Sequence, residues 1–316
     1  MTVLVVIEHD RGTLAPASLE ALAAALRLDP HVEALTIGAT ADAFAPELAA
    51  HGAAVVHQVH AAVLSDYGPE AWGEVVAQAV RSLRPTVVLA CGTDRGNEVM
   101  AQAAARLDLP MVANCVEIDS ATWTITRVRW GGSLLEQCTL SAATKLLTFA
   151  HHSHEATPSA AAGTVVSLMV ELDPSLSRTV VTERVERTAG VTLATAPLVV
   201  GGGRAVGSAE GFAPLEALAA RLGGVVGCSR AVTNNGWRNH TDQVGQTGTR
   251  IAPDLYIACG ISGAIQHWVG AMASKQILAI NTDPEANMVT KADYAVIGDL
   301  HTVVPAITAE IIRRNG

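Results

Sequence analysis

Short apolar runs alternate with longer amphipathic segments through the first 109 residues, and this alternation limits the folds that the chain can adopt. The apolar runs predict strands, and the segments between them have the apolar spacing of helices. Strands that alternate with helices of this length are typical of βαβ units, a parallel sheet and right-handed crossovers. The expected strands are 3–8, 32–38, 53–60 and 86–92, and the expected helices are 16–28, 42–52, 69–83 and 94–109.

The pattern changes between residues 112 and 150, where strand-like segments follow one another with only short turns between them. Such a run predicts antiparallel strands added to the edge of the first sheet. The polar, small-residue stretch 151–163 predicts a loop. The strand-like segments are 112–119, 122–130, 132–140 and 144–150, and two further strands are expected at 164–172 and 179–188.

A second βαβ pattern begins after a domain boundary that we place at residue 190. We therefore expect an α/β fold with two domains, 1–190 and 191–316. The first is a mostly parallel sheet with antiparallel additions, and the second is a doubly wound domain. Its expected strands are 197–204, 224–232, 254–260, 276–281 and 293–298, and its expected helices are 211–223, 262–273 and 299–316.

Composition narrows the range of partners. The formal charge is −9 at pH 7, which argues against a nucleic-acid partner because nucleic-acid binders usually carry a basic field. No apolar run reaches membrane-spanning length, so we expect no direct membrane insertion. The five cysteines are odd in number and form no CxxC pair, a usage typical of reduced thiols in a cytoplasmic protein.

Unusual residues follow the expected strands of the second domain, at the sheet edge where open parallel sheets bind ligands. Glycines there let a phosphate approach the backbone, and a helix that begins near Ser262 would offer free N–H groups. Arg204 and Arg230 could neutralise a diphosphate or a reduced flavin ring. Asn281 and Asp299 could hydrogen-bond a sugar or adenine.

Each of these features also has an ordinary structural explanation. Glycines end strands, serine caps helices, and Asp299 could cap the last helix. The stretch "GGGRAVG" fits neither a Walker A loop nor G-x-G-x-x-G. The binding-site interpretation is favoured because such residues follow every expected strand of this domain.

Longer motifs in the second domain are similar to those of a known family. They are "VVGGGRAVGSAEGF", "GCSRAV", "QVGQTG", "APDLYIACGISGAIQH", "AINTDPEA" and "ADYAVIGDL". Spanning residues 197–305, they resemble the alpha subunit of electron transfer flavoproteins. The first half matches more loosely, through "VLVVIEH" and "EVMAQAAARLDLP". The resemblance implies that the second domain holds FAD.

The same resemblance assigns residues to parts of FAD. Arg204 and Ser229 would lie near the diphosphate, and Arg230 would lie over the isoalloxazine ring. Thr247 would be near N5 and His267 near the C2 carbonyl, where Arg230 and His267 would stabilise the charge of the reduced ring. The implied contacts are Val244, Gly245, Gln246 and Thr247 at the ring edge; Ser262, Gly263, Ala264, Ile265, Gln266 and His267 along the ribityl and diphosphate; and Asn281, Asp299 and Leu300 at the adenosine end.

The resemblance further implies a one-to-one heterodimer with a beta subunit, which itself carries AMP or a second FAD. The complex would take electrons from flavin dehydrogenases and deliver them to a membrane quinone-linked oxidoreductase. It would thus be an electron carrier rather than an enzyme with its own substrate. Two alternatives stay open: a subunit of an electron-bifurcating, NADH-oxidising complex of the same family, and a non-redox adenine-nucleotide binding module.

A few positions depart from the family's pattern, and none of them is among the predicted flavin contacts. They bear on redox tuning and on which partners dock. The departures are Asn234 for Asp, Thr249 for Lys, and Thr282, Asn287 and Met288 for the family's Lys and Pro-Ile.

A cluster of histidines lies in the expected loop 151–163. His151, His152, His154 and Glu155 bear metal-ligating groups, but no second group of ligands lies near them in the sequence. We therefore expect no metal site there.

Overall fold

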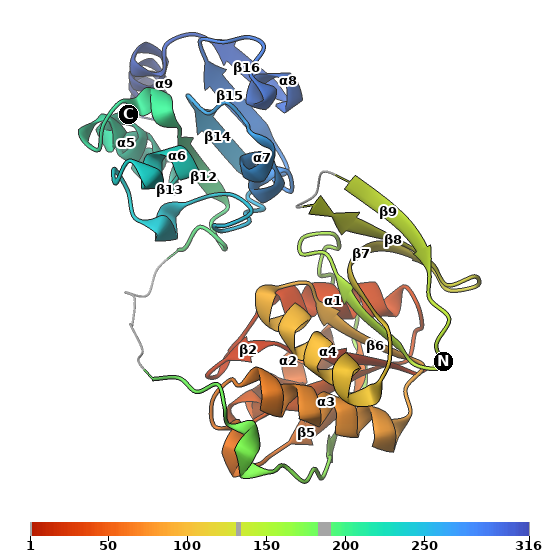
Figure 1. The fold of residues 1–316 in the computed structure, drawn as a ribbon. Coiled ribbons are helices and arrows are strands. Elements are labelled where there is room, and N and C mark those ends of the chain that lie inside the picture. The colour runs from red at the N-terminus through yellow and green to blue at the C-terminus, as the bar shows by residue number, and fades with distance from the viewer. Residues whose placement is uncertain (1, 131–133, 183–190, 316) are drawn as a thin grey trace. The chain divides into compact units, whose positions relative to one another are not determined.

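The computed structural model describes residues 2–130, 134–182 and 191–315 and shows two compact α/β units (Figure 1). The first unit contains the described residues up to 182, and the second those from 191 onward. The predicted fold class is thereby confirmed. The predicted boundary at residue 190 lies outside the described residues and stays a prediction.

A nine-stranded sheet in the order β11-β5-β4-β1-β6-β10-β7-β8-β9 forms the centre of the first unit. Neighbours from β11 to β7 are parallel, whereas β7, β8 and β9 are antiparallel. The antiparallel part lies at one edge, as predicted. The strands are β1 (Val3–Val6), β4 (Val32–Ile37), β5 (Ala53–Val59), β6 (Val87–Cys91), β7 (Met111–Asp119), β8 (Thr124–Arg129), β9 (Leu134–Thr139), β10 (Lys145–Phe149) and β11 (Thr164–Ser167), with a small hairpin of β2 (His9–Asp10) and β3 (Thr13–Leu14) beside them.

Strand β10 corrects one detail of the expected arrangement. The segment 144–150 was expected to continue the antiparallel run, yet β10 enters the sheet between β6 and β7 and is parallel to both. Leu146 and Leu147 are both fully buried, and they belong to the cores on opposite faces of the sheet. A strand that is apolar on both faces is more stable in the sheet interior than at an edge.

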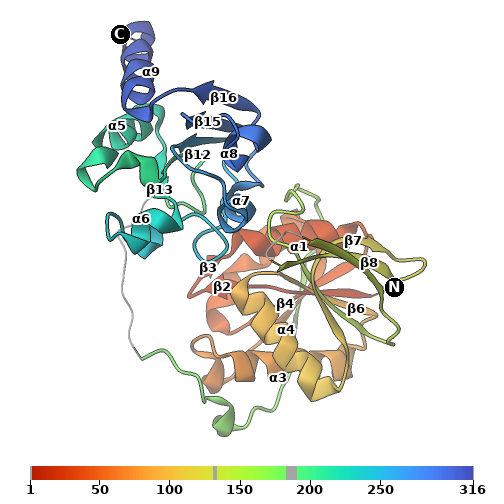
Figure 2. The ribbon, with the colours of Figure 1, turned by 45° about the horizontal axis from the view of Figure 1, so that its top comes forward.

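Helices cover both faces of this sheet. On one face lie α1 (Pro16–Leu26) and α2 (Ala45–Ala50), and on the other α3 (Pro69–Leu83) and α4 (Asp94–Leu107), which lie side by side (Figure 2). Successive β1 residues alternate between the two cores, Val5 with α1 and Leu4 with α3. The expected helix 42–52 is split into a 3₁₀ segment, Ala39–Phe44, and α2, whose first turn contains a proline.

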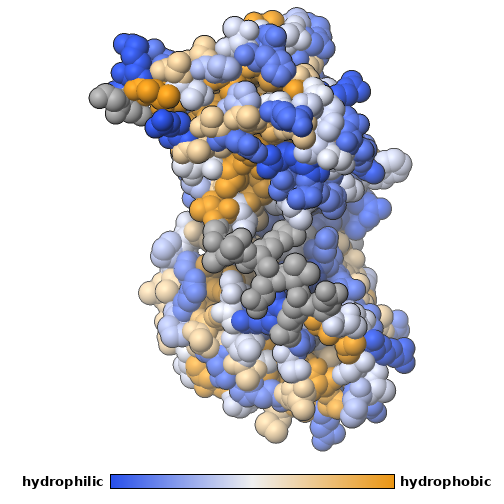
Figure 3. Space-filling model, turned by 90° about the vertical axis from the view of Figure 1, so that its left-hand side faces the viewer, coloured by the Kyte–Doolittle hydropathy of each residue, from blue (hydrophilic) through white to orange (hydrophobic). Residues whose placement is uncertain are grey.

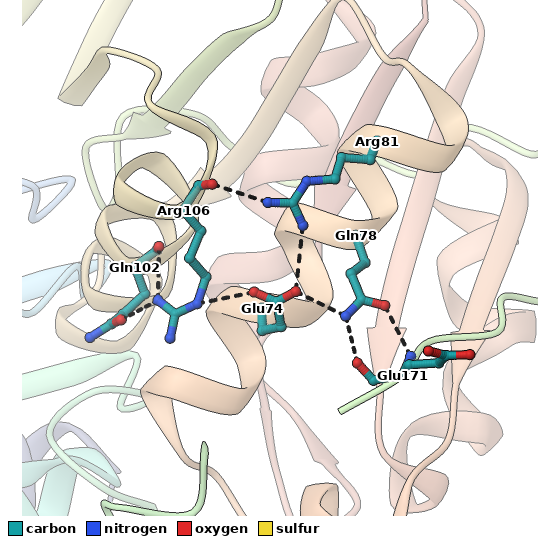
Figure 4. A network of polar contacts seen from close by, with 6 residues as sticks. All are labelled: Glu74, Gln78, Arg81, Gln102, Arg106 and Glu171. Atoms are coloured by element: carbon teal, nitrogen blue, oxygen red, sulfur yellow. Dashed lines mark hydrogen bonds and ion pairs between the residues drawn. The ribbon is translucent and has the colours of Figure 1, made fainter. Parts of the chain in front are cut away.

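A polar network ties the segment after β11 to α3 (Figure 4). Gln78 donates a hydrogen bond to the carbonyl of Glu171 at 2.7 Å and accepts one from its N–H at 3.0 Å. Gln78 also donates to Glu74, whose carboxylate pairs with Arg106 of α4 at 3.2 Å. One carboxylate thus links the two helices, while one amide holds the backbone of residue 171.

The second unit has a five-stranded sheet in the order β13-β12-β14-β15-β16, and all neighbours are parallel. Helices α5, α6 and α9 pack on one face and α7 and α8 on the other, which confirms the doubly wound architecture. The elements are β12 (Leu198–Gly202), α5 (Ala213–Leu222), β13 (Val225–Cys228), α6 (Arg230–Asn234), β14 (Leu255–Cys259), α7 (Ile265–Ala271), β15 (Ile277–Asn281), α8 (Asn287–Lys291), β16 (Tyr294–Ile297) and α9 (Leu300–Asn315).

Three expected strands differ from the structure. The strand 224–232 ends at Cys228, because α6 begins two residues later. The strand 164–172 is confined to Thr164–Ser167. Of the expected strand 179–188, residues 179–182 are not in a strand, and 183–188 lie outside the described residues.

On the face drawn in Figure 3, hydrophobic residues occur in small groups between hydrophilic ones. Among the helices of the described ranges, none combines the length and the apolar character that a membrane span requires.

Candidate functional site

The strand order of the second unit creates a crevice. From β12 the chain passes to β13 on one side, and the later strands follow β14 on the other side. In open parallel sheets, ligands bind at such a reversal, outside the carboxyl ends of the strands. A cavity of about 580 Å³ lies there, and its walls come from the segments that follow β12, β13, β14 and β15.

The ends of β12 and β14 approach each other so closely that only glycine fits. Gly203 donates a backbone hydrogen bond to Cys259 at 2.8 Å. A Cβ on Gly203 would lie 2.0 Å from the carbonyl oxygen of Gly260. Glycine after β12 is therefore required by backbone packing at the crevice, whether or not a phosphate approaches it.

A loop over 260–264, and not a helix, forms the wall beyond β14. The helix was expected to begin at residue 262, but α7 begins at Ile265. The expectation was wrong because Gly260 and Gly263 have φ values of 62° and 76°, in the left-handed region that a right-handed helix excludes. Ser262 therefore does not cap a helix.

Asn281, the last residue of β15, fixes this loop. Its Nδ2 donates to the carbonyl of Ile261 at 3.0 Å. Its Oδ1 accepts the backbone N–H of Asp283 at 3.1 Å. Both groups of the side chain are thus used within the protein, which sets the shape of this part of the wall.

Positive charge predominates at the cavity. Arg204 and Arg230 both line it and are exposed, and neither forms an ion pair with any residue of the described ranges. The carboxylate in the lining belongs to Asp283. Uncompensated guanidinium groups favour an anionic ligand, because they present paired N–H donors to phosphate or carboxylate oxygens.

His267 is a buried polar group in the cavity wall, 7% exposed. Its Nε2 lies 2.8 Å from the hydroxyl of Tyr256, and its buried Nδ1 forms no hydrogen bond within the part of the chain that the structure describes. Burial lowers the pKa of His267 to about 4, and the nearby backbone of Val244 offsets only part of this effect without forming a hydrogen bond of normal geometry with the ring. Burial also raises the pKa of Tyr256 well above its usual range. Both groups are therefore neutral at pH 7.

Most of the sequence-predicted contacts come together at this cavity. These residues lie on four different segments of the chain, which the parallel sheet brings to one edge. They are Arg204, Ser229, Arg230, Ser262, Gly263, Ala264, Gln266, His267 and Asn281.

The loop 244–247 does not line the cavity. Val244 is 1% exposed and belongs to the core, and Gly245 is packed against Gly270. Gln246 donates its backbone N–H to the carbonyl of Gln266 at 2.7 Å, which attaches the loop to α7. Gln246 and Thr247 are exposed. The predicted flavin contacts of this loop stay predictions.

Three other predicted contacts also lie outside the lining. Ile265 is 43% exposed at the start of α7, and Leu300 is buried in the core. Asp299 precedes α9, and its carboxylate accepts the backbone N–H of His301 at 2.9 Å. This is the helix-capping role that the sequence left open as its ordinary explanation.

Two polar residues of the lining were not among the predicted contacts. Asn234 lies four residues after Arg230 in α6, and Asp283 lies two residues after Asn281. The helical spacing was a usable signal for Asn234, because residues i and i+4 share a face. For Asp283, its place just after a strand was the corresponding signal.

Comparison with known families follows the same division of the chain. A family model described as "Electron transfer flavoprotein domain" matches residues 3–173. A second, "Electron transfer flavoprotein FAD-binding domain", matches residues 192–272. The chain belongs to the electron transfer flavoprotein alpha-subunit family.

Curated relatives agree along almost the whole chain. The electron transfer flavoprotein subunit alpha of Bacillus subtilis is 35% identical, covering 99% of this chain and 98% of that protein. The Mycobacterium tuberculosis (strain CDC 1551 / Oshkosh) subunit is 37% identical, covering 99% of each. That of Bradyrhizobium diazoefficiens is 38% identical, covering 98% of each. Membership in the electron transfer flavoprotein alpha-subunit family supports a role in electron transfer.

Proposed function

We propose that this chain is the FAD-holding subunit of a heterodimeric electron transfer flavoprotein. In this proposal it shuttles electrons from flavin dehydrogenases to a membrane quinone-linked oxidoreductase. The observation that supports it most is the cavity at the strand-order reversal, whose wall combines the unpaired guanidinium groups of Arg204 and Arg230 with the buried imidazole of His267. A dinucleotide with an anionic centre and a polar ring matches that combination.

The residues at the cavity fit FAD in charge and in hydrogen-bonding capacity. In the proposal, Arg204 and Ser229 hold the diphosphate. The unpartnered Nδ1 of His267 is a buried polar atom whose pairing a ligand acceptor would complete. Gly263 lets the loop lie against α8, since a Cβ there would be 2.3 Å from the backbone nitrogen of Met288.

FAD, when bound, supplies reversible one- and two-electron chemistry. The contribution of the protein is charge and orientation. Arg230 is always charged and would stabilise the reduced ring more than the oxidised one. His267 would donate from a neutral imidazole. The remaining contacts proposed from the family pattern are Val244, Gly245, Gln246 and Thr247 at the ring edge, Ser262, Ala264, Ile265 and Gln266 along the ribityl chain, and Asn281, Asp299 and Leu300 at the adenosine end.

An apolar edge on the first unit supports pairing with a beta subunit. Leu134 and Leu135 of β9 are 54% and 70% exposed, and Trp130 is 79% exposed. Large apolar side chains that are exposed along an edge strand are candidates for a protein–protein contact. We propose a one-to-one heterodimer in which the partner covers this edge.

The test is to co-express the chain with a beta subunit and to identify the flavin that denaturation releases. We expect a yellow complex that releases at least one FAD per alpha chain. Release of FMN, or a complex that stays colourless after incubation with FAD, would contradict the proposal.

A further inference from the structure

Three metal-ligating side chains meet in the first unit, away from the cavity described above. Glu20 lies on α1, and His151 and His152 follow β10. One ligand atom from each lies within 4.8 Å of the other two. Glu20 is 132 positions before His152 in the chain, so this carboxylate could not be assigned to the histidines from the sequence.

The distances suit a single small cation. Oε1 of Glu20 lies 3.2 Å from Nδ1 of His152 and 3.8 Å from Nε2 of His151. Tetrahedral zinc with ligand bonds of about 2.0–2.1 Å separates its ligand atoms by roughly 3.3–3.4 Å. The two observed distances bracket this value, so small side-chain shifts would place all three ligand atoms around one cation.

The surrounding backbone holds these groups in place. The N–H of His152 donates to Oε2 of Glu20 at 2.7 Å, which leaves Oε1 for the imidazoles. His152 adopts a left-handed φ of 61°, and its ring stacks on that of His151 with centroids 3.6 Å apart. The turn is anchored to β7 by a hydrogen bond from Ala150 to the carbonyl of Cys115 at 2.8 Å. Hydrogen-bonded carboxylates of this kind orient metal ligands.

An ion pair between Glu20 and His152 would involve only one of the two ring nitrogens, Nδ1 of His152. Nε2 of His152 is buried and has no partner among the described residues. The contact with Glu20 thus leaves one ring nitrogen of His152 without a hydrogen bond in this part of the chain.

We infer that Glu20, His151 and His152 form a zinc-type site in the first unit. Two imidazoles and one carboxylate are ligands that suit Zn²⁺ and related transition metals rather than Ca²⁺ or Mg²⁺. Three protein ligands leave a fourth position for water or another small ligand. The ligand side chains are 14–23% exposed, which leaves solvent access to that position.

His154 and Glu155 are not part of this group. The ring of His154 packs edge-on against Phe149 at 4.6 Å, and its Nδ1 lies 3.0 Å from the hydroxyl of Ser153. The site therefore uses two of the histidines that the sequence singled out, together with a carboxylate from another element.

The test is a Zn²⁺ titration of the untagged full-length chain in its flavin-containing complex, in competition with a chromophoric chelator. We expect one Zn²⁺ per alpha chain, with affinity lowered at least about 10-fold in Glu20→Gln and in His151→Asn. Glu33→Gln is the matched control, because Glu33 pairs with His57 at 2.7 Å outside any three-ligand group of the described residues. Its affinity should equal that of the wild type.

X-ray absorption at the zinc edge provides a second readout on the wild-type complex, independent of whether a variant folds. We expect a nitrogen–oxygen ligand shell with two imidazoles. Absence of stoichiometric binding, an equal loss of affinity in Glu33→Gln, or a shell without imidazole would overturn the inference.

Discussion

The hydroxyl of Tyr256 lies 2.8 Å from Nε2 of His267, a residue of the cavity wall in the second unit, and both side chains are buried. Both groups are neutral at pH 7, so the donor in this hydrogen bond can be identified from the protons that each group carries. The phenol proton needs an acceptor, and within the described residues Nε2 of His267 is its hydrogen-bond partner. Tyr256 therefore donates, and His267 carries its own proton on Nδ1. Tyr256 is thus a positioning residue for the imidazole.

Removing this hydroxyl tests that assignment. Tyr256→Phe should destabilise the second unit by about 1–2 kcal/mol, because Nε2 of His267 loses its partner while staying buried. It should also change the flavin potential of the complex, since His267 becomes free to change tautomer. Redox titration and unfolding of the complex measure the two effects. Tyr294→Phe, at a tyrosine that is 59% exposed, should change neither.

Acid should destabilise the second unit through His267. Its folded pKa is about 4 against an ordinary value of 6.5, so the unfolded chain binds the proton more tightly. The contribution to stability is present above pH 6.5 and is lost as pH falls toward 4. Between pH 7 and pH 5 the loss is about 2 kcal/mol.

Hydrogen exchange of β14 peptides measures this loss in the second unit alone. His267→Gln should lose about 2 kcal/mol less than the wild type over the same pH range, because Gln does not titrate. An identical pH dependence in the two proteins would show that His267 is not the group responsible.

The approach of β12 to β14 predicts a steric effect at Gly203. Gly203→Ala should destabilise the second unit by about 2–3 kcal/mol, because the added Cβ meets backbone that cannot move freely. Gly207→Ala is the comparison, since a Cβ there meets nothing within 4 Å and its cost of about 1 kcal/mol comes from a positive φ alone. Chemical unfolding followed by hydrogen exchange should rank the variants in this order. Equal effects would count against close strand packing.

The amide of Gln78 predicts a local effect in the first unit. Gln78→Ala removes both hydrogen bonds to the backbone of Glu171 and should raise hydrogen exchange around residue 171 by about 10-fold, equivalent to about 1.4 kcal/mol. Gln102→Ala is the control, because Gln102 contacts Arg106 and not residue 171. Unchanged exchange in Gln78→Ala would mean that other contacts hold this segment.

Much of the fold could be predicted from the sequence. Apolar runs such as 87–91 and 255–259 occupy central parallel strands, where burial on both faces requires apolar residues throughout. The position of β10 could not be predicted, because its burial pattern suits either direction of pairing. The choice depends on contacts with β6 and β7 that lie far from it in the sequence.

The candidate site was predictable where it depended on strand ends. Arg204, Ser229 and Asn281 lie together because parallel strands end at one edge. The start of α7 was missed because the glycines at 260 and 263 adopt left-handed conformations that the amino-acid type permits but does not require. Glu20 beside His152 was missed because only the packing of α1 on the sheet brings them together.

If the cavity of the second unit holds a flavin, the flavin potential should depend on the charge of Arg230. Arg230→Ala should lower the flavin potential of the complex, because a fixed positive charge stabilises the reduced ring more than the oxidised one. A differential interaction of about 1.4 kcal/mol corresponds to about 59 mV for a one-electron couple. The exposure of Arg230 keeps the shift on the order of tens of millivolts.

The measurement is a redox titration of wild-type, Arg230→Ala and Arg221→Ala complexes, each with full FAD occupancy. Arg221 is the control, because it is an exposed arginine on α5 that does not line the cavity. We expect a lower potential in Arg230→Ala and the wild-type potential in Arg221→Ala. The same potential in all three complexes would contradict a flavin in this cavity.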